Sequence, residues 1–196
     1  MPSQTELAVQ FVTEVFGVKV RKGSGLHHLY HLFAVANIVG GFGGGDHEQA
    51  LALLHDIYDN TRIPQGTIEA LFDRLIPVEL RLLHIRRDLP WAMRKAQEVD
   101  TISVCNESVA LVMLADKIDN LMTTDRLITG LEAPARNEYW SRFNAQDAMQ
   151  SRFYFDFVDA ARKNPEISGD EGNFQTRCAL SELIEYVNNV WPDGAL

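Results

Sequence analysis

The chain carries its most informative stretch at Leu53-Leu54-His55-Asp56-Ile57-Tyr58-Asp59-Asn60-Thr61, where a His-Asp doublet lies inside an apolar, helix-like run. Burying charge without a partner costs several kcal/mol, so this doublet needs a compensating group. A divalent metal ion supplies one. A solvated helix end is the plainer interpretation of the doublet alone, and the rest of the chain decides between the two.

Two further segments supply matching side chains in apolar surroundings. His31 lies upstream in Leu29-Tyr30-His31-Leu32-Phe33, and Asp116 lies downstream in Leu114-Ala115-Asp116-Lys117-Ile118. With His55 and Asp56 they form a set of two imidazoles and two carboxylates. Such a set suits Mn²⁺, Fe²⁺ or Zn²⁺ better than Mg²⁺ or Ca²⁺, which prefer oxygen ligands. The residue types leave the choice among these three ions open.

The order of these motifs resembles a known family. Arg21-Lys22-Gly23 precedes His31, the doublet continues to Asp59-Asn60-Thr61, and Ala115-Asp116-Lys117 is followed by Asn120 and Thr123. The pattern is similar to the HD superfamily of metal-dependent phosphohydrolases. More narrowly, it resembles the hydrolase domain of RelA/SpoT-type alarmone enzymes in its single-domain form, the small alarmone hydrolases. The resemblance runs from about residue 4 to about residue 163 and implies an all-α, HD-domain helical bundle.

The resemblance also implies an activity and a set of site residues. The implied reaction is the metal-dependent hydrolysis of guanosine tetra- or pentaphosphate (ppGpp or pppGpp) to GDP or GTP and pyrophosphate. The implied residues are His31, His55, Asp56 and Asp116 as ligands of a divalent ion, with Mn²⁺ expected first and Fe²⁺ or Zn²⁺ as the other choices; Arg21 at the guanine; Lys22 and Lys117 at phosphate; and Asn120 and Thr123 at the nucleoside.

One departure from the family concerns catalysis. Where the family has Glu-Asp after the doublet, this chain has Asp59-Asn60. On a helix, Asp59 shares the face of His55, so it can position the attacking water. Asn60 can form hydrogen bonds but cannot take up a proton near neutral pH. We therefore expect Asp59 and Asn60 in the catalytic positions. General acid-base catalysis contributes roughly 10²- to 10⁴-fold to the rate, so we expect turnover to be slower than with the Glu-Asp pair but not abolished.

Two alternatives follow from the same residues. The chain could be an HD phosphohydrolase that acts on another phosphorylated nucleotide, such as NADPH, because contacts in the pocket rather than the metal site select the substrate. It could also be a regulatory nucleotide-binding protein, in which Asp59-Asn60 leaves binding intact and catalysis weak.

Composition limits the class of partner. The 196 residues are 46% hydrophobic and 23% charged, which suits one globular domain over residues 1–196. A net charge of −9 argues against DNA or RNA as a partner, whereas a small nucleotide needs only a local basic cluster. No apolar run approaches the roughly 20 residues of a membrane span. We expect a cytoplasmic protein without membrane contact, with reduced Cys105 and Cys178, and leave a homo-oligomer open.

Periodicity predicts helices throughout the chain. In the first half of the chain we expect a helix capped by Thr5 that runs to Phe16, one over 27–39 that carries His31, and one from about Asp46 that delivers His55 and Asp56. Short helices opened by Pro64, Pro77 and Pro90 should follow. We then expect a helix from about 107 to 127 that carries Asp116, and long helices over about 137–163 and 173–190, the last of which packs on the rest. On the helix of Asp116 we expect Asn120 and Thr123 to share its face and Asp119 to be solvated. We expect His28 to lie at the surface or to hydrogen-bond a ligand, and assign no function to His84.

Overall fold

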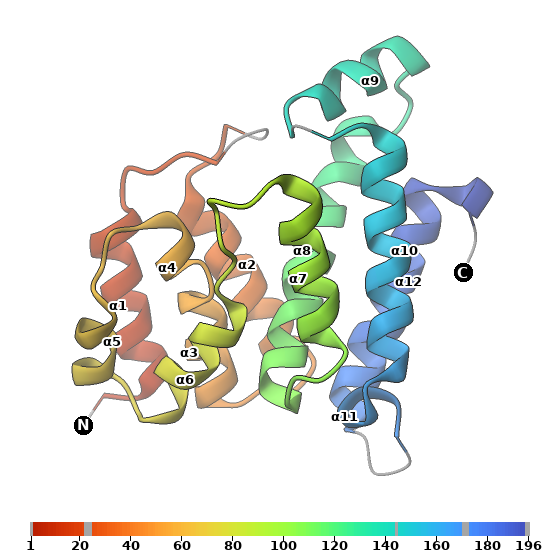
Figure 1. Ribbon diagram of the computed structural model, residues 1–196. Helices are drawn as coiled ribbons and strands as arrows, with labels where there is room; N and C mark the ends of the chain where they lie inside the picture. Colours follow the sequence, from red (N-terminus) through yellow and green to blue (C-terminus); the bar gives the residue numbers. More distant parts are fainter. Residues whose placement is uncertain (1, 22–24, 144, 170–172, 195–196) are drawn as a thin grey trace.

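The computed structural model describes residues 2–21, 25–143, 145–169 and 173–194. Within them all regular structure is helical, apart from an isolated bridge between Val20 and His27 (Figure 1). The expected all-α class is therefore confirmed. No helix in the described part of the chain has the length and apolar character needed to cross a membrane.

The helices follow one another closely along the chain. They are α1 (Gln4–Phe16), α2 (His28–Gly41), α3 (Asp46–Leu54), α4 (Ile57–Asn60), α5 (Gln65–Leu71), α6 (Leu75–Leu83), α7 (Trp91–Ile102), α8 (Glu107–Ile128), α9 (Ala133–Ser141), α10 (Asp147–Lys163), α11 (Pro165–Ser168) and α12 (Phe174–Val190), followed by a 3₁₀ turn at Pro192–Gly194.

Helix α8 organises the packing. Its sequence is apolar on more than one face, and it packs against α12 on one side and against α2 and α3 on the other. Figure 1 shows α1, α3, α5 and α6 grouped together, with α10 and α12 on the opposite side of the molecule. Leu32, Leu51 and Ile118 are fully buried in the shared core. Burial of each such side chain stabilises the fold by about 1.5–3 kcal/mol. The predicted C-terminal helix thus packs along the helix that carries Asp116.

A glycine-rich turn places α3 beside α2. Gly43 has a φ of 92°, a conformation that glycine adopts without strain. A Cβ on Gly44 would lie 2.5 Å from Cγ1 of Val39, so only glycine allows this close approach. The turn brings the end of α3, and with it His55, back towards α2.

Several helix boundaries differ from the sequence prediction. Helix α6 begins at Leu75, so Pro77 lies within its first turn and does not open it. Ser3, not Thr5, caps α1, in a capping box with Glu6. The helix expected over 27–39 starts at His28 and continues through Gly41. The helix expected over 137–163 is instead two helices, because α9 ends at Ser141 and α10 begins at Asp147.

Candidate functional site

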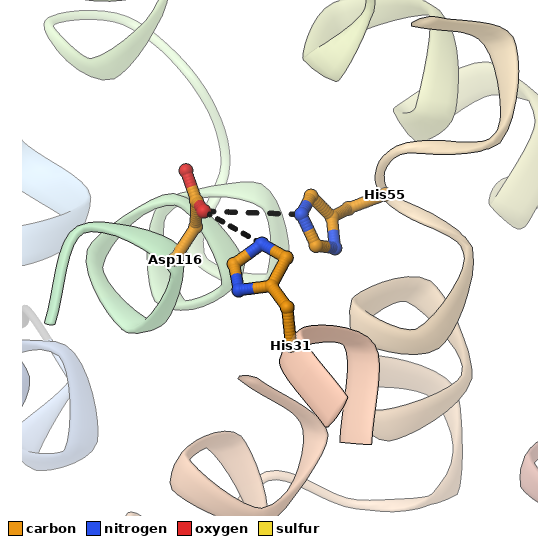
Figure 2. Close-up of side chains that lie close together, drawn as sticks. All are labelled: His31, His55 and Asp116. Carbon is orange, nitrogen blue, oxygen red and sulfur yellow. Dashed lines mark ion pairs between the residues drawn. The ribbon is translucent and has the colours of Figure 1, made fainter. Parts of the chain in front are cut away.

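Three of the four predicted metal ligands meet at one point. His31 comes from α2, His55 follows α3 and Asp116 comes from α8, and one ligand atom of each lies within 4.8 Å of the others (Figure 2). Oδ1 of Asp116 lies 3.2 Å from Nε2 of His31 and 3.9 Å from Nε2 of His55. The cluster joins segments that are distant in sequence.

Both imidazoles have their Nδ1 atom occupied. Nδ1 of His55 lies 2.7 Å from the carbonyl oxygen of Ala52, and since a carbonyl only accepts, this nitrogen carries the proton. Nε2 of His55 is buried without a hydrogen-bond partner within the described residues. An orphaned buried nitrogen beside a carboxylate fits a divalent ion, because metal-binding histidines usually donate the other ring N–H to such a group.

The carboxylate of Asp119 holds the imidazole of His31, and its position differs from the one predicted. We expected Asp119 to be solvated, but it is buried and its Oδ2 lies 2.6 Å from Nδ1 of His31. Residues three apart on a helix are neighbours, so Asp119 shares a face with Asp116. Burial alone would lower the pKa of His31, but the hydrogen bonds that its imidazole donates to Asp116 and Asp119 raise it. The carboxylate of Asp119 therefore orients the imidazole of His31 so that its Nε2 faces the carboxylate of Asp116.

Asp56 lies at the edge of the cluster. Its Oδ2 is 3.9 Å from Nε2 of His55 and 2.7 Å from Nε2 of His28. Burial alone would raise the pKa of Asp56, but the charge of His55 and the hydrogen bond from His28 hold it below its usual value. His28 thus hydrogen-bonds a predicted ligand, in keeping with one of the two roles expected for it.

Asp59 and Asn60 occupy different surroundings. Asp59 lines the cavity next to the cluster, and its Oδ1 lies 2.6 Å from Nδ1 of His84. Burial, and then the like charge of Asp56, raise the pKa of Asp59. Asn60 is not among the described residues that line this cavity, and its carbonyl oxygen accepts a hydrogen bond from Nζ of Lys19. No spacing in the sequence connects His84 with Asp59, so the sequence alone predicts no function for His84.

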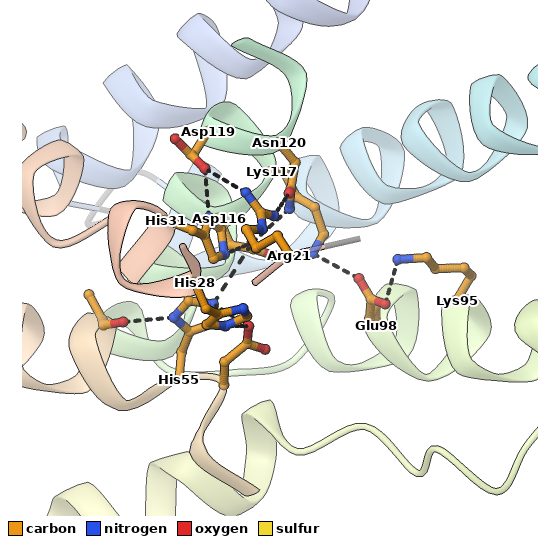
Figure 3. Close-up of polar contacts among 12 residues, drawn as sticks. Arg21, His28, His31, His55, Lys95, Glu98, Asp116, Lys117, Asp119 and Asn120 are labelled. Carbon is orange, nitrogen blue, oxygen red and sulfur yellow. Dashed lines mark hydrogen bonds and ion pairs between the residues drawn. The ribbon is translucent and has the colours of Figure 1, made fainter. Parts of the chain in front are cut away.

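Three of the predicted nucleotide contacts, Arg21, Lys117 and Asn120, form a chain of polar interactions beside the cluster (Figure 3). Arg21 donates to Oδ1 of Asn120 at 2.6 Å, and Asn120 donates to Oδ1 of Asp116 at 2.7 Å. Lys117 is buried, with Nζ at 2.5 Å from Asp116 and 2.8 Å from Glu98. Lys117 therefore contacts a predicted metal ligand as well as the cavity. Lys22 lies outside the described residues.

Two adjoining cavities share a basic wall. One, of about 320 Å³, opens on the His-Asp cluster, and the other, of about 300 Å³, is lined by Thr123 and by aromatic side chains. Both are lined by four cationic residues that we call the cation belt: Arg21, Arg87, Arg94 and Lys95. The aromatic side chains of the second cavity are Trp91, Tyr139, Trp140, Phe143 and Tyr154. Nε of Arg94 is buried without a hydrogen-bond partner in the described part of the chain.

Solved structures share this fold. The structure of lmo0812 from Listeria monocytogenes EGD-e matches with a TM-score of 0.71 and 19% identity, over 86% of this chain and 99% of that chain. A metazoan ortholog of SpoT, described as hydrolysing ppGpp and playing a role in starvation responses, matches with a TM-score of 0.71 and 19% identity, over 100% of this chain and 99% of that chain. Neither the known family models nor the curated protein sequences give a match. The fold expected from the resemblance to alarmone hydrolases is therefore confirmed.

Proposed function

We propose that this protein is a metal-dependent phosphohydrolase of the HD type that removes the 3′-pyrophosphate of ppGpp or pppGpp. The observation that carries the proposal is the cluster of His31, His55 and Asp116, which opens on a cavity continuous with the cation belt and an aromatic wall. The shared fold with a SpoT ortholog that hydrolyses ppGpp supports the same substrate.

The two cavities suit a nucleotide that carries phosphates on more than one side. A pyrophosphate at the cluster would lie next to the cation belt, where Arg87, Arg94 and Lys95 can offset further phosphate charge. The base would lie in the second cavity, where Tyr139 and Phe143 offer aromatic surfaces and Arg21 can stack on a planar ring. Thr123 lines this second cavity, in keeping with a contact to the nucleoside.

The chemistry follows from the residues at the cluster. His31, His55 and Asp116, with Asp56 at the edge, would hold a divalent ion that acts as a Lewis acid and lowers the pKa of water. Asp59 faces the same cavity and takes the proton of the attacking water. The new bond joins the water oxygen to phosphorus, and the bond from phosphorus to the 3′ oxygen breaks. The 3′ oxygen gains a proton from solvent, and Asp59 returns its own to solvent.

The packing of α12 along α8 supports a single hydrolase domain, because the C-terminal helix buries the back of the helix that carries Asp116. We propose, as the sequence predicts, one hydrolase domain over residues 1–196, in which the C-terminal helix packs on the part that resembles the family, about residues 4–163.

A binding protein without turnover remains the second candidate, favoured by one observation. Asn60 replaces the second acidic residue of the family motif and does not line the cavity among the described residues. In that case the protein would bind the nucleotide and release it unchanged.

A single panel of assays separates these functions. Purified protein is loaded with Mn²⁺, Fe²⁺ or Zn²⁺ and offered ppGpp, NADPH and a set of dNTPs, while pyrophosphate and phosphate release are followed separately and dissociation constants are measured. We expect pyrophosphate from ppGpp alone. Phosphate release from NADPH would move the activity to the alternative substrate, and tight ppGpp binding without release would identify a binding protein. Replacement of Asp56 by Ala should abolish metal uptake and hydrolysis together.

A further inference from the structure

A histidine outside the metal cluster holds the carboxylate proposed as the general base. His84 directly follows α6, and its Nδ1 lies 2.6 Å from Oδ1 of Asp59. The backbone amide of Ile85 donates to the same oxygen at 3.1 Å and to Oδ2 at 3.4 Å. Two donors therefore converge on Oδ1, whereas Oδ2 receives only the longer amide contact within the described residues.

The segment that carries His84 is fixed in place. Gln97 on α7 donates Nε2 to the carbonyl oxygen of His84 at 2.8 Å, and its Oε1 accepts from the amide of Arg86 at 3.3 Å. The ring of Tyr58 meets the imidazole edge to face, with centroids 6.1 Å apart. The imidazole of His84 is 42% exposed. Even so, Gln97 anchors the backbone at His84 and Arg86, and the contacts with Asp59 and Tyr58 set the direction of the ring.

Asn60 cannot share the role of Asp59. Its amide does not take up a proton near neutral pH, and Asn60 is absent from the described lining of the cavity. The ionisable side chain that directly contacts Asp59 is His84 instead. His84 therefore occupies the place, beside the base, where a second ionisable group can act.

We propose that His84 is a positioning residue for Asp59: its Nδ1–H holds Oδ1, so that Oδ2 faces the attacking water and takes its proton. The inference rests on the proposed hydrolysis. An ionised carboxylate only accepts hydrogen bonds, so Nδ1 carries the proton whenever Asp59 is ready to act as a base. Locking one rotamer of Asp59 before the reaction lowers the entropic part of the barrier.

Steady-state kinetics on the Mn²⁺-loaded protein with ppGpp tests this role. We expect His84→Ala to lower kcat by about 10- to 100-fold, the usual cost of losing an orienting partner, with KM unchanged. His84→Asn should restore kcat to near the wild-type value, because its amide places an N–H donor where Nδ1 was. His47→Ala is the matched control. It removes a histidine–carboxylate pair with the same 2.6 Å distance, to Glu79, neither member of which is among the residues that line the cavity, and should leave kcat unchanged.

A double substitution shows whether His84 acts through Asp59. In an Asp59→Asn background, His84→Ala should cause no further loss, since the group it positions is already gone. Additive losses, or a His84→Ala variant with wild-type kcat, would overturn the inference while hydrolysis itself stands. A lower Mn²⁺ content in His84→Ala would overturn it too, because His84 would then support the metal. A wild type that hydrolyses no ppGpp with any of the three metals overturns the proposed function and the inference together.

Discussion

At the scale of single residues, Asp119 would orient His31 for the metal ion proposed at the cluster. Its carboxylate fixes the proton on Nδ1 of His31 and leaves Nε2 directed at Asp116. We expect Asp119→Ala to weaken Mn²⁺ affinity by about 10- to 100-fold, measured by calorimetric titration. Asp125→Ala is the matched control, because that half-buried carboxylate on the same helix accepts a hydrogen bond from Thr129 and is not part of the cluster. Equal affinities for the two variants would contradict the role of Asp119.

The raised pKa of Asp59 determines how activity should depend on pH. Burial, and then the charge of Asp56, disfavour the ionised form. A general base works only when ionised, so kcat should fall as pH drops through this raised pKa, above the usual Asp value of about 3.9. The measurement is kcat for ppGpp as a function of pH at saturating substrate. A rate that stays constant down to about pH 4 would show that Asp59 keeps an ordinary pKa or is not the base.

Single residues also show where sequence reasoning stops. His31, His55 and Asp116 could be selected from the sequence because each is a polar side chain within an apolar segment, where burial requires a compensating partner. Asp119 was detectable in principle, because its spacing of three from Asp116 puts both on one face of the helix. His84 was not, since its contact with Asp59 depends on how α6 ends against α4.

At the scale of secondary structure, local signals located most helices, and tertiary contacts decided the exception. The segment over 137–163 contains no Gly or Pro, so periodicity predicted one continuous helix. Trp140 stacks on Trp191 at 5.7 Å, and Tyr139 shares a hydrogen bond of 3.0 Å with Thr124. These contacts hold α9 in a direction of its own, and no pattern within the segment encodes them.

The N-terminus of α1 depends on a carboxylate from another helix. Asp46, the first residue of α3, accepts from the amides of Gln4 at 2.8 Å and Thr5 at 2.9 Å. The backbone hydrogen bond of Thr5 is the largest influence that lowers the pKa of Asp46 to about 2. A depressed pKa stabilises the folded state above the unfolded-state value of about 3.9, and this stabilisation is lost as pH falls through about 2.

We therefore expect Asp46→Asn to lower the free energy of unfolding near neutral pH, by roughly 1 kcal/mol as for the loss of a helix cap. The difference from wild type should shrink as pH falls from about 4 to about 2, because protonation weakens the wild-type contact. Urea unfolding followed by circular dichroism measures both effects. Asp88→Asn is the control, since its pair with Arg86 is exposed and should contribute little. A difference that is independent of pH would contradict the assignment.

At the scale of the whole molecule, charge is distributed unevenly. The net charge is −9, yet Arg21, Arg87, Arg94 and Lys95 gather on one shared cavity wall. An acidic protein with a local basic wall favours a small anion, such as a nucleotide, over a long polyanion such as DNA or RNA. We expect Arg94→Ala to raise the dissociation constant for ppGpp by about 10- to 100-fold, the value of a charge-assisted hydrogen bond of about 1.5–3 kcal/mol.

The matched control is Arg152→Ala, an arginine that is 79% exposed and pairs with Asp156 on the outer surface of α10. Its effect on ppGpp binding should be negligible. Fluorescence or calorimetric binding assays at low and high salt provide the comparison, because a cation that meets phosphate also makes affinity depend on ionic strength. Wild-type affinity in Arg94→Ala would remove the cation belt from the binding site.

The cluster also links three parts of the chain that meet only in the folded protein. His31 belongs to α2, His55 follows α3 and Asp116 belongs to α8, so an ion held among them binds the native state and not the unfolded chain. At a free Mn²⁺ concentration of about 100 times the dissociation constant, metal binding should raise the free energy of unfolding by about 2.7 kcal/mol, which corresponds to an increase of roughly 5–10 °C in Tm for a chain of this size. Chelation should reverse the shift. In thermal unfolding with and without Mn²⁺, His47→Ala should keep the shift and His55→Ala should lose it. If His55→Ala gains as much stability from Mn²⁺ as wild type does, the ion binds elsewhere and the metal site proposed for this cluster is wrong.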